Sequence, residues 1–358
     1  MHLSALLQLA VSRKASDLHL TNQCAPILRI DGVLVAVNSP ALSREELKQL
    51  IYQALSEQQI RKFEAEKELD FSLAPKGMDR FRVNVHVQRG AVEAALRRIP
   101  MLIPTMETLN LPLIAADLAR KPNGLVLVTG PAGSGKTTTQ AAMVDRINAE
   151  AAKVIICIED PIEYLHVNKR SIVKQREVYR DTNTFAEALK RCLRQDPNVI
   201  VIGEMRDLET ISAALTAAET GHLVIATLHT PDAPQSIDRI IDVFPPHQQP
   251  QVRLQLSSTL QGVISQQLIP LASGKGRILA AEVMIATAGV RNMIRDRQTE
   301  QIRSAIQTGA SLGMKTMDKA LKDLCEKSLI SYEVALSLAA KAEEFKALMG
   351  SPKQRSEP

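Results

Sequence analysis

The stretch that decides the fold is "GLVLVTGPAGSGKTTTQ", residues 124–140. An apolar run leads directly into residues 130–137, which fit the pattern G-x-x-x-x-G-K-[ST]. A continuous apolar strand predicts burial on both faces, as in a parallel sheet covered by helices. The glycines let backbone N–H groups curl around phosphate oxygens, and the helix that follows adds positive potential. The stretch therefore predicts a nucleotide-binding loop between a strand and a helix.

The loop assigns roles to individual side chains. Lys136 is expected to reach the β and γ phosphates, and Thr137 to coordinate Mg²⁺. An ordinary glycine-rich turn is the alternative, but this pattern follows a strand and opens a helix, as phosphate binding requires. We therefore expect ATP and Mg²⁺ as ligands. The predicted nucleotide-binding residues are Gly130, Ala132, Gly133, Ser134, Gly135, Lys136, Thr137 and Thr138.

Three more apolar strands alternate with helical stretches beyond this loop: "KVIICIED" (153–160), "NVIVIGE" (198–204) and "HLVIATLH" (222–229). The alternation predicts an α/β fold with a parallel sheet. Two of these strands end in carboxylates. Either can hold Mg²⁺ while the other positions the attacking water, and periodicity does not decide between Glu163 and Glu204. Simple capping of strand and loop is the alternative for Glu163 and its neighbours Glu159 and Asp160.

Histidines and arginines supply further candidates. His222 and His229 flank the last of these strands. A lone histidine is often an ordinary core or surface residue, but His229 follows the carboxyl end of a buried parallel strand, where ligands bind. The arginines are either solvated surface residues or candidates for an arginine finger supplied by a neighbouring subunit. They are Arg80, Arg82, Arg89, Arg97 and Arg98 in the first hundred residues, and Arg239 later.

Residues 1–100 follow a different pattern. An amphipathic helix begins the chain, Asp31-Gly32 predicts a hairpin, and Phe81, Val83, Val85 and Val87 alternate with polar residues. This predicts a small α+β domain with an antiparallel sheet. Prolines then indicate a linker at 101–112, followed by an ATPase domain at 113–350. We expect the chain to be mostly helical from about residue 250, and disordered at 351–358.

Composition narrows the functional classes. The chain has 358 residues and a net charge of +5, which suits an acidic partner, nucleic acid or simply a charge-speckled surface. Helix-turn-helix, zinc-finger and aromatic stacking signatures are missing, so nucleic-acid binding is not expected. The four dispersed cysteines lack zinc-ligand spacing and fit a reducing cytosol. No apolar run is long enough to span a bilayer, so we expect a cytoplasmic protein with at most a peripheral membrane role.

Four boxes occur in a specific order: "GPAGSGKTT" (130–138), "IEDPIE" (158–163), "RQDPNVIVIGEMRD" (194–207) and "TAAETGHLVIATLHT" (216–230). With them the chain resembles the secretion and type IV pilus motor ATPases over nearly its whole length. The short length and the lack of a tetracysteine zinc site distinguish it from extension and secretion motors. "AIQTGASLGMKTMDKAL" and "GVRNMIRD" are similar to motifs of the retraction ATPases, where the second usually reads AIRNLIRE.

The resemblance implies a PAS-like N-terminal domain and a RecA-like ATPase domain in a homohexameric ring. It implies that Glu204, in the Walker B box, holds Mg²⁺ directly or through water, that Glu163 is the general base, and that His229 contacts the γ phosphate. It also implies an activity, ATP hydrolysis that drives pilus retraction and twitching through an inner-membrane platform protein. A secretion or DNA-uptake motor is the alternative, followed by a nucleic-acid translocase. The residues implied to complete a neighbour's site are Arg82, Arg97 and Arg239.

Overall fold

The computed structural model describes residues 2–30, 32–99 and 101–349. The tail predicted to be disordered, 351–358, lies outside these residues. The chain divides into two compact units, each described by itself below. The first unit runs to Ile103 and includes the segment Pro161–Leu165; the second begins at Pro104 and holds the rest. The predicted boundaries at 100, 112 and 350 stay predictions.

The first unit is built on a six-stranded antiparallel sheet in the order β3-β2-β1-β6-β5-β4. Phe81, Val83 and Val85 are buried as their alternation predicts, but Val87 is 39 % exposed because it lies near the end of its strand. The strands are β1 (Asp17–Leu20), β2 (Ile27–Ile30), β3 (Val33–Ala36), β4 (Glu68–Leu73), β5 (Arg80–Gln88) and β6 (Ala91–Ile99), and the helices are α1 (Leu3–Ser12), α2 (Arg44–Tyr52) and α3 (Glu57–Glu66). The predicted antiparallel sheet is confirmed.

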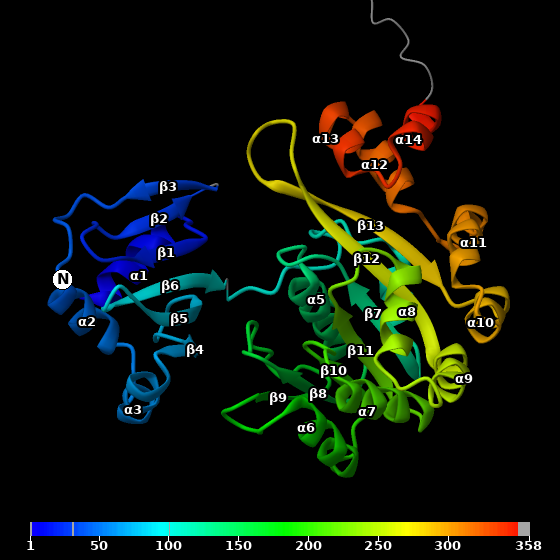
Figure 1. Ribbon diagram of the computed structural model, residues 1–358, viewed down its shortest axis with the longest axis horizontal. Coiled ribbons are helices and arrows are strands. Elements are labelled where there is room, and N and C mark those ends of the chain that lie inside the picture. The colour runs from blue at the N-terminus through cyan, green and yellow to red at the C-terminus, as the bar shows by residue number, and fades with distance from the viewer. Residues whose placement is uncertain (1, 31, 100, 350–358) are drawn as a thin grey trace, which may run out of the picture. The chain divides into compact units, whose positions relative to one another are not determined.

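The second unit contains a seven-stranded sheet in the order β13-β12-β7-β11-β10-β8-β9 (Figure 1). Every neighbouring pair is parallel except β12–β13. The four apolar strands predicted from the sequence are β7, β8, β10 and β11, and their parallel arrangement is confirmed. The bounds are β7 (Gly124–Thr129), β8 (Val154–Glu159), β9 (Ile172–Glu177), β10 (Val199–Ile202), β11 (Leu223–Leu228), β12 (Leu260–Pro270) and β13 (Arg277–Ile285).

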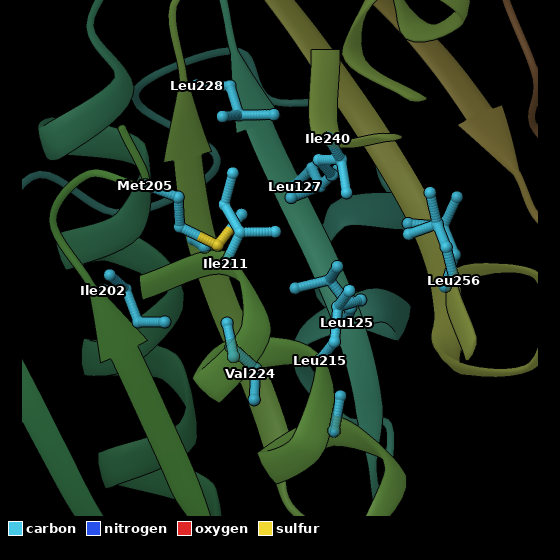
Figure 2. Close-up of a cluster of buried hydrophobic side chains, with 14 of the residues drawn as sticks. Leu125, Leu127, Ile202, Met205, Ile211, Leu215, Val224, Leu228, Ile240 and Leu256 are labelled. Atoms are coloured by element: carbon cyan, nitrogen blue, oxygen red, sulfur yellow. The ribbon is translucent and has the colours of Figure 1, made fainter. Parts of the chain in front are cut away.

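Helices cover both faces of this sheet, because alternate residues of its strands enter two different cores. Leu125, Leu127 and Ile202 pack with α7, α8 and α9 (Figure 2), whereas Val126 and Val128 pack with α4 and α5. This two-sided burial explains why the strands read as unbroken apolar runs. The helices are α4 (Ile114–Ala119), α5 (Lys136–Glu150), α6 (Phe185–Cys192), α7 (Leu208–Glu219), α8 (Ala233–Asp242), α9 (Gln249–Thr259), α10 (Ala288–Arg295), α11 (Ile302–Thr308), α12 (Met317–Glu326), α13 (Tyr332–Leu338) and α14 (Ala342–Met349).

The prediction of a mostly helical chain from about residue 250 missed the hairpin β12–β13. Polar residues inside β12 hide the strand from an apolar-run criterion, since Ser265 and Gln266 are both fully buried. Their hydrogen bonds come from far along the chain. Thr129 Oγ1 donates to Ser265 Oγ over 2.9 Å, and Gln266 Nε2 donates to Thr139 Oγ1 over 2.7 Å. Buried polar groups are tolerated when paired in this way.

Candidate active site

The predicted phosphate loop connects β7 to α5. Its three glycines adopt positive φ angles: 139° at Gly130, 76° at Gly133 and 88° at Gly135. A Cβ atom on Gly130 would lie only 2.3 Å from the carbonyl oxygen of Gln266 in β12. Only glycine therefore fits there, on steric grounds as well as for its φ. The tight turn leaves the backbone of this loop free to approach a ligand closely.

Lys136 is folded back onto the loop that it follows. Its Nζ atom donates to the carbonyl oxygens of Gly130, over 2.8 Å, and Pro131, over 3.0 Å. Burial lowers the pKa of Lys136, while the nearby charge of Glu204 acts in the opposite direction. The Ser134 hydroxyl is buried and has no hydrogen-bond partner among the described residues. An ammonium group on replaceable carbonyls and an unpaired hydroxyl are both groups that a phosphate would satisfy.

Glu204 lies just beyond β10 and is held by two cationic or polar neighbours. His229 Nε2 lies 3.0 Å from Glu204 Oε1, and Arg206 Nε donates to the same oxygen. Burial alone would raise the pKa of Glu204, but the hydrogen bond from Arg206 and the charge of His229 together lower it below its ordinary value. The carboxylate is therefore ionised at neutral pH and available to a cation.

His229 connects this carboxylate to the phosphate loop. Its Nδ1 atom lies 3.4 Å from Lys136 Nζ, while its other ring nitrogen faces Glu204. The strand order explains why these residues lie close together. β7, β11 and β10 are neighbours in the sheet, and the phosphate loop, His229 and Glu204 follow their respective ends. Carboxyl ends of parallel strands lie along one edge of a sheet, where ligands bind. The predicted residues Lys136, Glu204 and His229 are thus brought together.

The residues present fit a magnesium ion that is completed by a nucleotide. Within the described ranges, no group of three or more His, Cys, Asp or Glu side chains forms a ready-made metal site. Mg²⁺ keeps several waters and is commonly bound by one or two carboxylates plus substrate phosphates. The ionised carboxylate of Glu204 and the half-buried hydroxyl of Thr137, in the first turn of α5, provide oxygen donors of this kind.

Glu163 has a different setting, in the segment that groups with the first unit. Its Oε1 atom lies 3.8 Å from Arg82 Nη1. Arg82 is paired across the sheet with Arg97, and Arg97 with Asp17, so three charged residues form a row across β5, β6 and β1. Arg97 Nε donates to Asp17 Oδ1 over 3.0 Å. Burial alone would raise the pKa of Asp17, but this bond and one from Ser16 lower it.

The remaining predicted residues lie apart from these contacts. His222 is at the opposite, amino end of β11, where its Nδ1 atom lies 3.0 Å from the carbonyl oxygen of Ala217. It therefore has a local structural role. Arg239 lies in the last turn of α8. Glu159 accepts a hydrogen bond from Gln175 Nε2 over 2.9 Å, on the neighbouring strand β9.

Sequence reasoning missed two residues that support the site. Gln140, buried in α5, donates from Nε2 to the carbonyl oxygens of Ile202, over 3.0 Å, and Ile225, over 3.3 Å. These hydrogen bonds connect α5 to β10 and β11, the strands that lead to Glu204 and His229. Arg206 is the second, and its place two positions after Glu204 was the available signal. A buried glutamine in a helix gives no such signal.

The segment "GVRNMIRD" (289–296) lies largely in α10, and this helix has one buried face. Val290 and Ile294 are buried, and Met293 packs partly against the same core. Arg291, in the same helix, binds backbone carbonyl groups. Its guanidinium donates to the carbonyl oxygens of Ala286, Ser257 and Ser258, at 3.0, 2.7 and 2.6 Å. It thereby satisfies carbonyls in the last turn of α9 and anchors α10 there.

A cavity of about 480 Å³ lies elsewhere in the second unit, by β9 and α6. Its lining is polar and includes Arg176, Arg180 and Arg191. None of the predicted nucleotide-binding residues lines it. The candidate site is therefore defined by the phosphate loop and its neighbours, and this cavity is not part of it.

Comparison with known proteins identifies the family. The profile of the family described as "Type II/IV secretion system protein" matches residues 1–312. The chain is 49% identical to the type IV pilus retraction ATPase PilT of Pseudomonas aeruginosa, over 96% of this chain and 100% of that protein. It is 44% identical to a twitching motility protein of Neisseria gonorrhoeae, over 90% and 86% of the two chains.

Solved structures agree. The crystal structure of the pilus retraction motor PilT with bound ADP matches with a TM-score of 0.89 and 46% identity, over 96% of this chain and 98% of that one. The Legionella pneumophila ATPase DotB matches with a TM-score of 0.81 and 28% identity, over 93% and 94%. Across the described residues, no helix combines the length and apolar character needed to cross a membrane. The chain belongs to the type II/IV secretion system protein family, among its PilT-type ATPases.

Proposed function

We propose that this protein is a motor ATPase that hydrolyses ATP to drive retraction of a type IV pilus. The observation that carries the proposal is the series of contacts from Lys136 through His229 to Glu204. These contacts lie beside a loop whose first position, Gly130, has room only for glycine. The retraction function itself is supported by the names of the similar proteins, PilT above all.

Nucleotide phosphates would replace the loop carbonyls as the partners of Lys136, whose ammonium group then neutralises the β and γ phosphates. Thr137 and Glu204 would hold Mg²⁺, which would help to neutralise the negative charge of the phosphates. His229 would contact the γ phosphate through one ring nitrogen, while the other, which faces Glu204, stays on that carboxylate. Glu163 is proposed as the general base, which orients the attacking water and accepts its proton.

The first unit would complete the site of a neighbouring subunit. Arg82 and Arg97 are paired residues on adjacent strands, and Asp17 fixes the guanidinium of Arg97. Such a pre-oriented pair suits the stabilisation of transition-state charge in trans, with Arg239 as a further candidate. We infer a homohexameric ring of PAS-like domains (1–100), linkers (101–112) and RecA-like ATPase domains (113–350). The ring would work in the cytoplasm, peripherally on an inner-membrane platform protein.

Two measurements on one pair of variants test this function. Lys136→Ala should lose about 10²-fold in nucleotide affinity, because charge-assisted hydrogen bonds to phosphate are lost. Lys190→Ala is the matched control, since Lys190 is an exposed lysine that forms a surface ion pair with Glu209. In a deletion strain, wild-type and Lys190→Ala genes should restore twitching, and Lys136→Ala should not. Normal twitching in the deletion strain would overturn the retraction function. It would not contradict nucleotide binding, which the affinity measurement tests separately.

A further inference from the structure

The backbone on both sides of Glu204 is bonded to one residue of the neighbouring strand. The side-chain hydroxyl of Thr227, in β11, donates to the carbonyl oxygen of Gly203. The backbone N–H of Met205 donates to the carbonyl oxygen of Thr227 over 3.1 Å. These are the two peptide groups that flank the Cα atom of Glu204. Thr227 therefore holds the backbone of Glu204 from both sides.

The hydroxyl of Thr227 continues the sheet at the point where β10 ends. The parallel pairing of β10 with β11 runs as far as Ile202 and Ala226. Gly203 and Thr227 are the next residues of the two chains, and there the hydrogen bond comes from the side chain. Thr227 is 3 % exposed, and a buried carbonyl or hydroxyl that loses its partner is disfavoured. The bond therefore keeps the chain beside β11 for one residue past the strand.

Other contacts fix the points at which the chain enters and leaves Glu204. The backbone N–H of Gly203 donates to the carbonyl oxygen of Ile158, in β8, over 2.8 Å. The side chain of Met205 is buried in the core that also contains Leu228 (Figure 2). Gly203 has no side chain of its own to restrict its backbone. The orientation of the peptide groups between these two points therefore depends on the bonds to Thr227.

The orientation of these peptide groups decides where the Glu204 carboxylate lies. Glu204 Oε1 is 3.0 Å from His229 Nε2, and His229 is two residues beyond Thr227 in the chain. Thr227 thus joins the two backbone segments from which the carboxylate and the imidazole extend. Mg²⁺ requires nearly ideal octahedral geometry, with oxygen ligands at about 2.0–2.1 Å. A rotated peptide group beside Glu204 would move the carboxylate out of such a geometry.

We propose that Thr227 is a positioning residue for Mg²⁺, whose hydroxyl and carbonyl oxygen hold the two peptide groups around Glu204 so that the carboxylate faces the ion. Thr227 acts through the backbone of Glu204 and not as a ligand. The inference rests on the proposed function in one respect, that Glu204 holds Mg²⁺. It deepens that function by naming a hydroxyl on which metal binding depends from outside the set of ligands.

The test is the ratio of nucleotide affinity in Mg²⁺ to that in a chelator, measured by fluorescent-nucleotide titration. Threonine and valine differ by the hydroxyl at nearly equal shape, and serine and alanine form a second such pair. Thr227→Val and Thr227→Ala should lower the ratio about fivefold and leave metal-free affinity within about twofold of wild type. Thr227→Ser should keep the ratio within about twofold, because its hydroxyl can still donate.

The second pair covers a Thr227→Val variant that fails to fold. Because serine and alanine both lack the methyl group of threonine, their comparison isolates the hydroxyl. Equal ratios in Thr227→Ser and Thr227→Ala would overturn the proposal. So would a ratio in Thr227→Val equal to that of wild type.

The same titration in Glu204→Gln shows whether Thr227 acts through Glu204. Residues that act through one another have non-additive effects. Adding Thr227→Val to Glu204→Gln should therefore lower the ratio by less than about twofold further. A further loss as large as the loss in the wild-type background would mean that Thr227 acts by another route, and would overturn the proposal.

Thr259→Val is the matched control. Thr259 is 6 % exposed, and its hydroxyl donates to the carbonyl oxygen of Gln255 over 2.7 Å. Its own carbonyl oxygen lies against Gly124, at the end of β7 opposite to the phosphate loop. This variant loses a comparable buried hydroxyl and should keep the ratio of the wild type. An equal loss in both valine variants would contradict a specific role for Thr227.

Glu204→Gln alone separates the two levels of the argument. If this variant keeps the full ratio, Glu204 is not a metal ligand, and the positioning role of Thr227 falls with that part of the proposed function. If Glu204→Gln lowers the ratio while Thr227→Val and Thr227→Ala keep it, only the positioning role fails.

Discussion

Two strand ends in this chain look alike in sequence and differ in structure. β8 leads into "EDPIE" (159–163), and β10 leads into "GEMRD" (203–207). Glu204, after β10, stays in the second unit and faces His229. Glu163, after β8, belongs to the segment that groups with the first unit and faces Arg82. The segment after β8 has more carboxylates than the segment after β10, but this number alone does not identify the metal-binding strand.

Strand order explains the difference better than acid content does. β10 is next to β11, which is next to the phosphate-loop strand β7, whereas β8 is one position further out. Glu204 thereby meets residues that contact the phosphate loop, while the chain after β8 leaves the second unit. This difference agrees with the roles proposed above, in which Glu204 acts in Mg-nucleotide binding and Glu163 acts in turnover. The predictions below are ordered by their expected effect on nucleotide affinity.

Among the variants that compare the two strand ends, the largest effect on nucleotide affinity is expected for Glu204→Gln. Loss of one anionic ligand should weaken Mg-nucleotide binding about tenfold, or about 1.4 kcal/mol, and leave metal-free binding nearly unchanged. Fluorescent-nucleotide titrations with and without a chelator measure both. Glu209→Gln is the control, since that side chain is 68% exposed and forms a surface ion pair with Lys190. Equal weakening with and without Mg²⁺ would remove Glu204 from the metal site.

A smaller effect on affinity is expected for Arg82→Ala. Binding should change less than about threefold, while turnover should fall about 10³-fold if the guanidinium stabilises transition-state charge. Mixing this variant with Lys136→Ala subunits should restore part of the activity, because intact halves of two defective subunits then meet. Arg61→Ala, an exposed arginine of α3 in the same unit, should behave as wild type. No recovery at any mixing ratio would contradict action in trans.

The sequence predicts the parts of this account that depend on local pattern. The phosphate loop, the four apolar strands and His229 at a strand end all follow from residues close in sequence. The hairpin β12–β13 does not, because the buried side chains of Gln266 and Ser265 form hydrogen bonds with Thr139 and Thr129 from elsewhere in the chain. The hydrogen bond from Arg97 to Asp17, which joins two strands of the sheet, could not be predicted either. Such pairings exist only once the chain has folded.

The central claim is that Glu163 acts on the water and Glu204 on the metal. Nucleotide binding and turnover of Glu163→Gln, measured on one preparation, test it most directly. The account predicts Mg-ATP affinity within about twofold of wild type and turnover lower by about 10²–10⁴-fold, the usual contribution of a general base. Turnover close to that of wild type would contradict it. So would a loss of Mg-dependent affinity equal to that of Glu204→Gln, since Glu163 would then be a metal ligand.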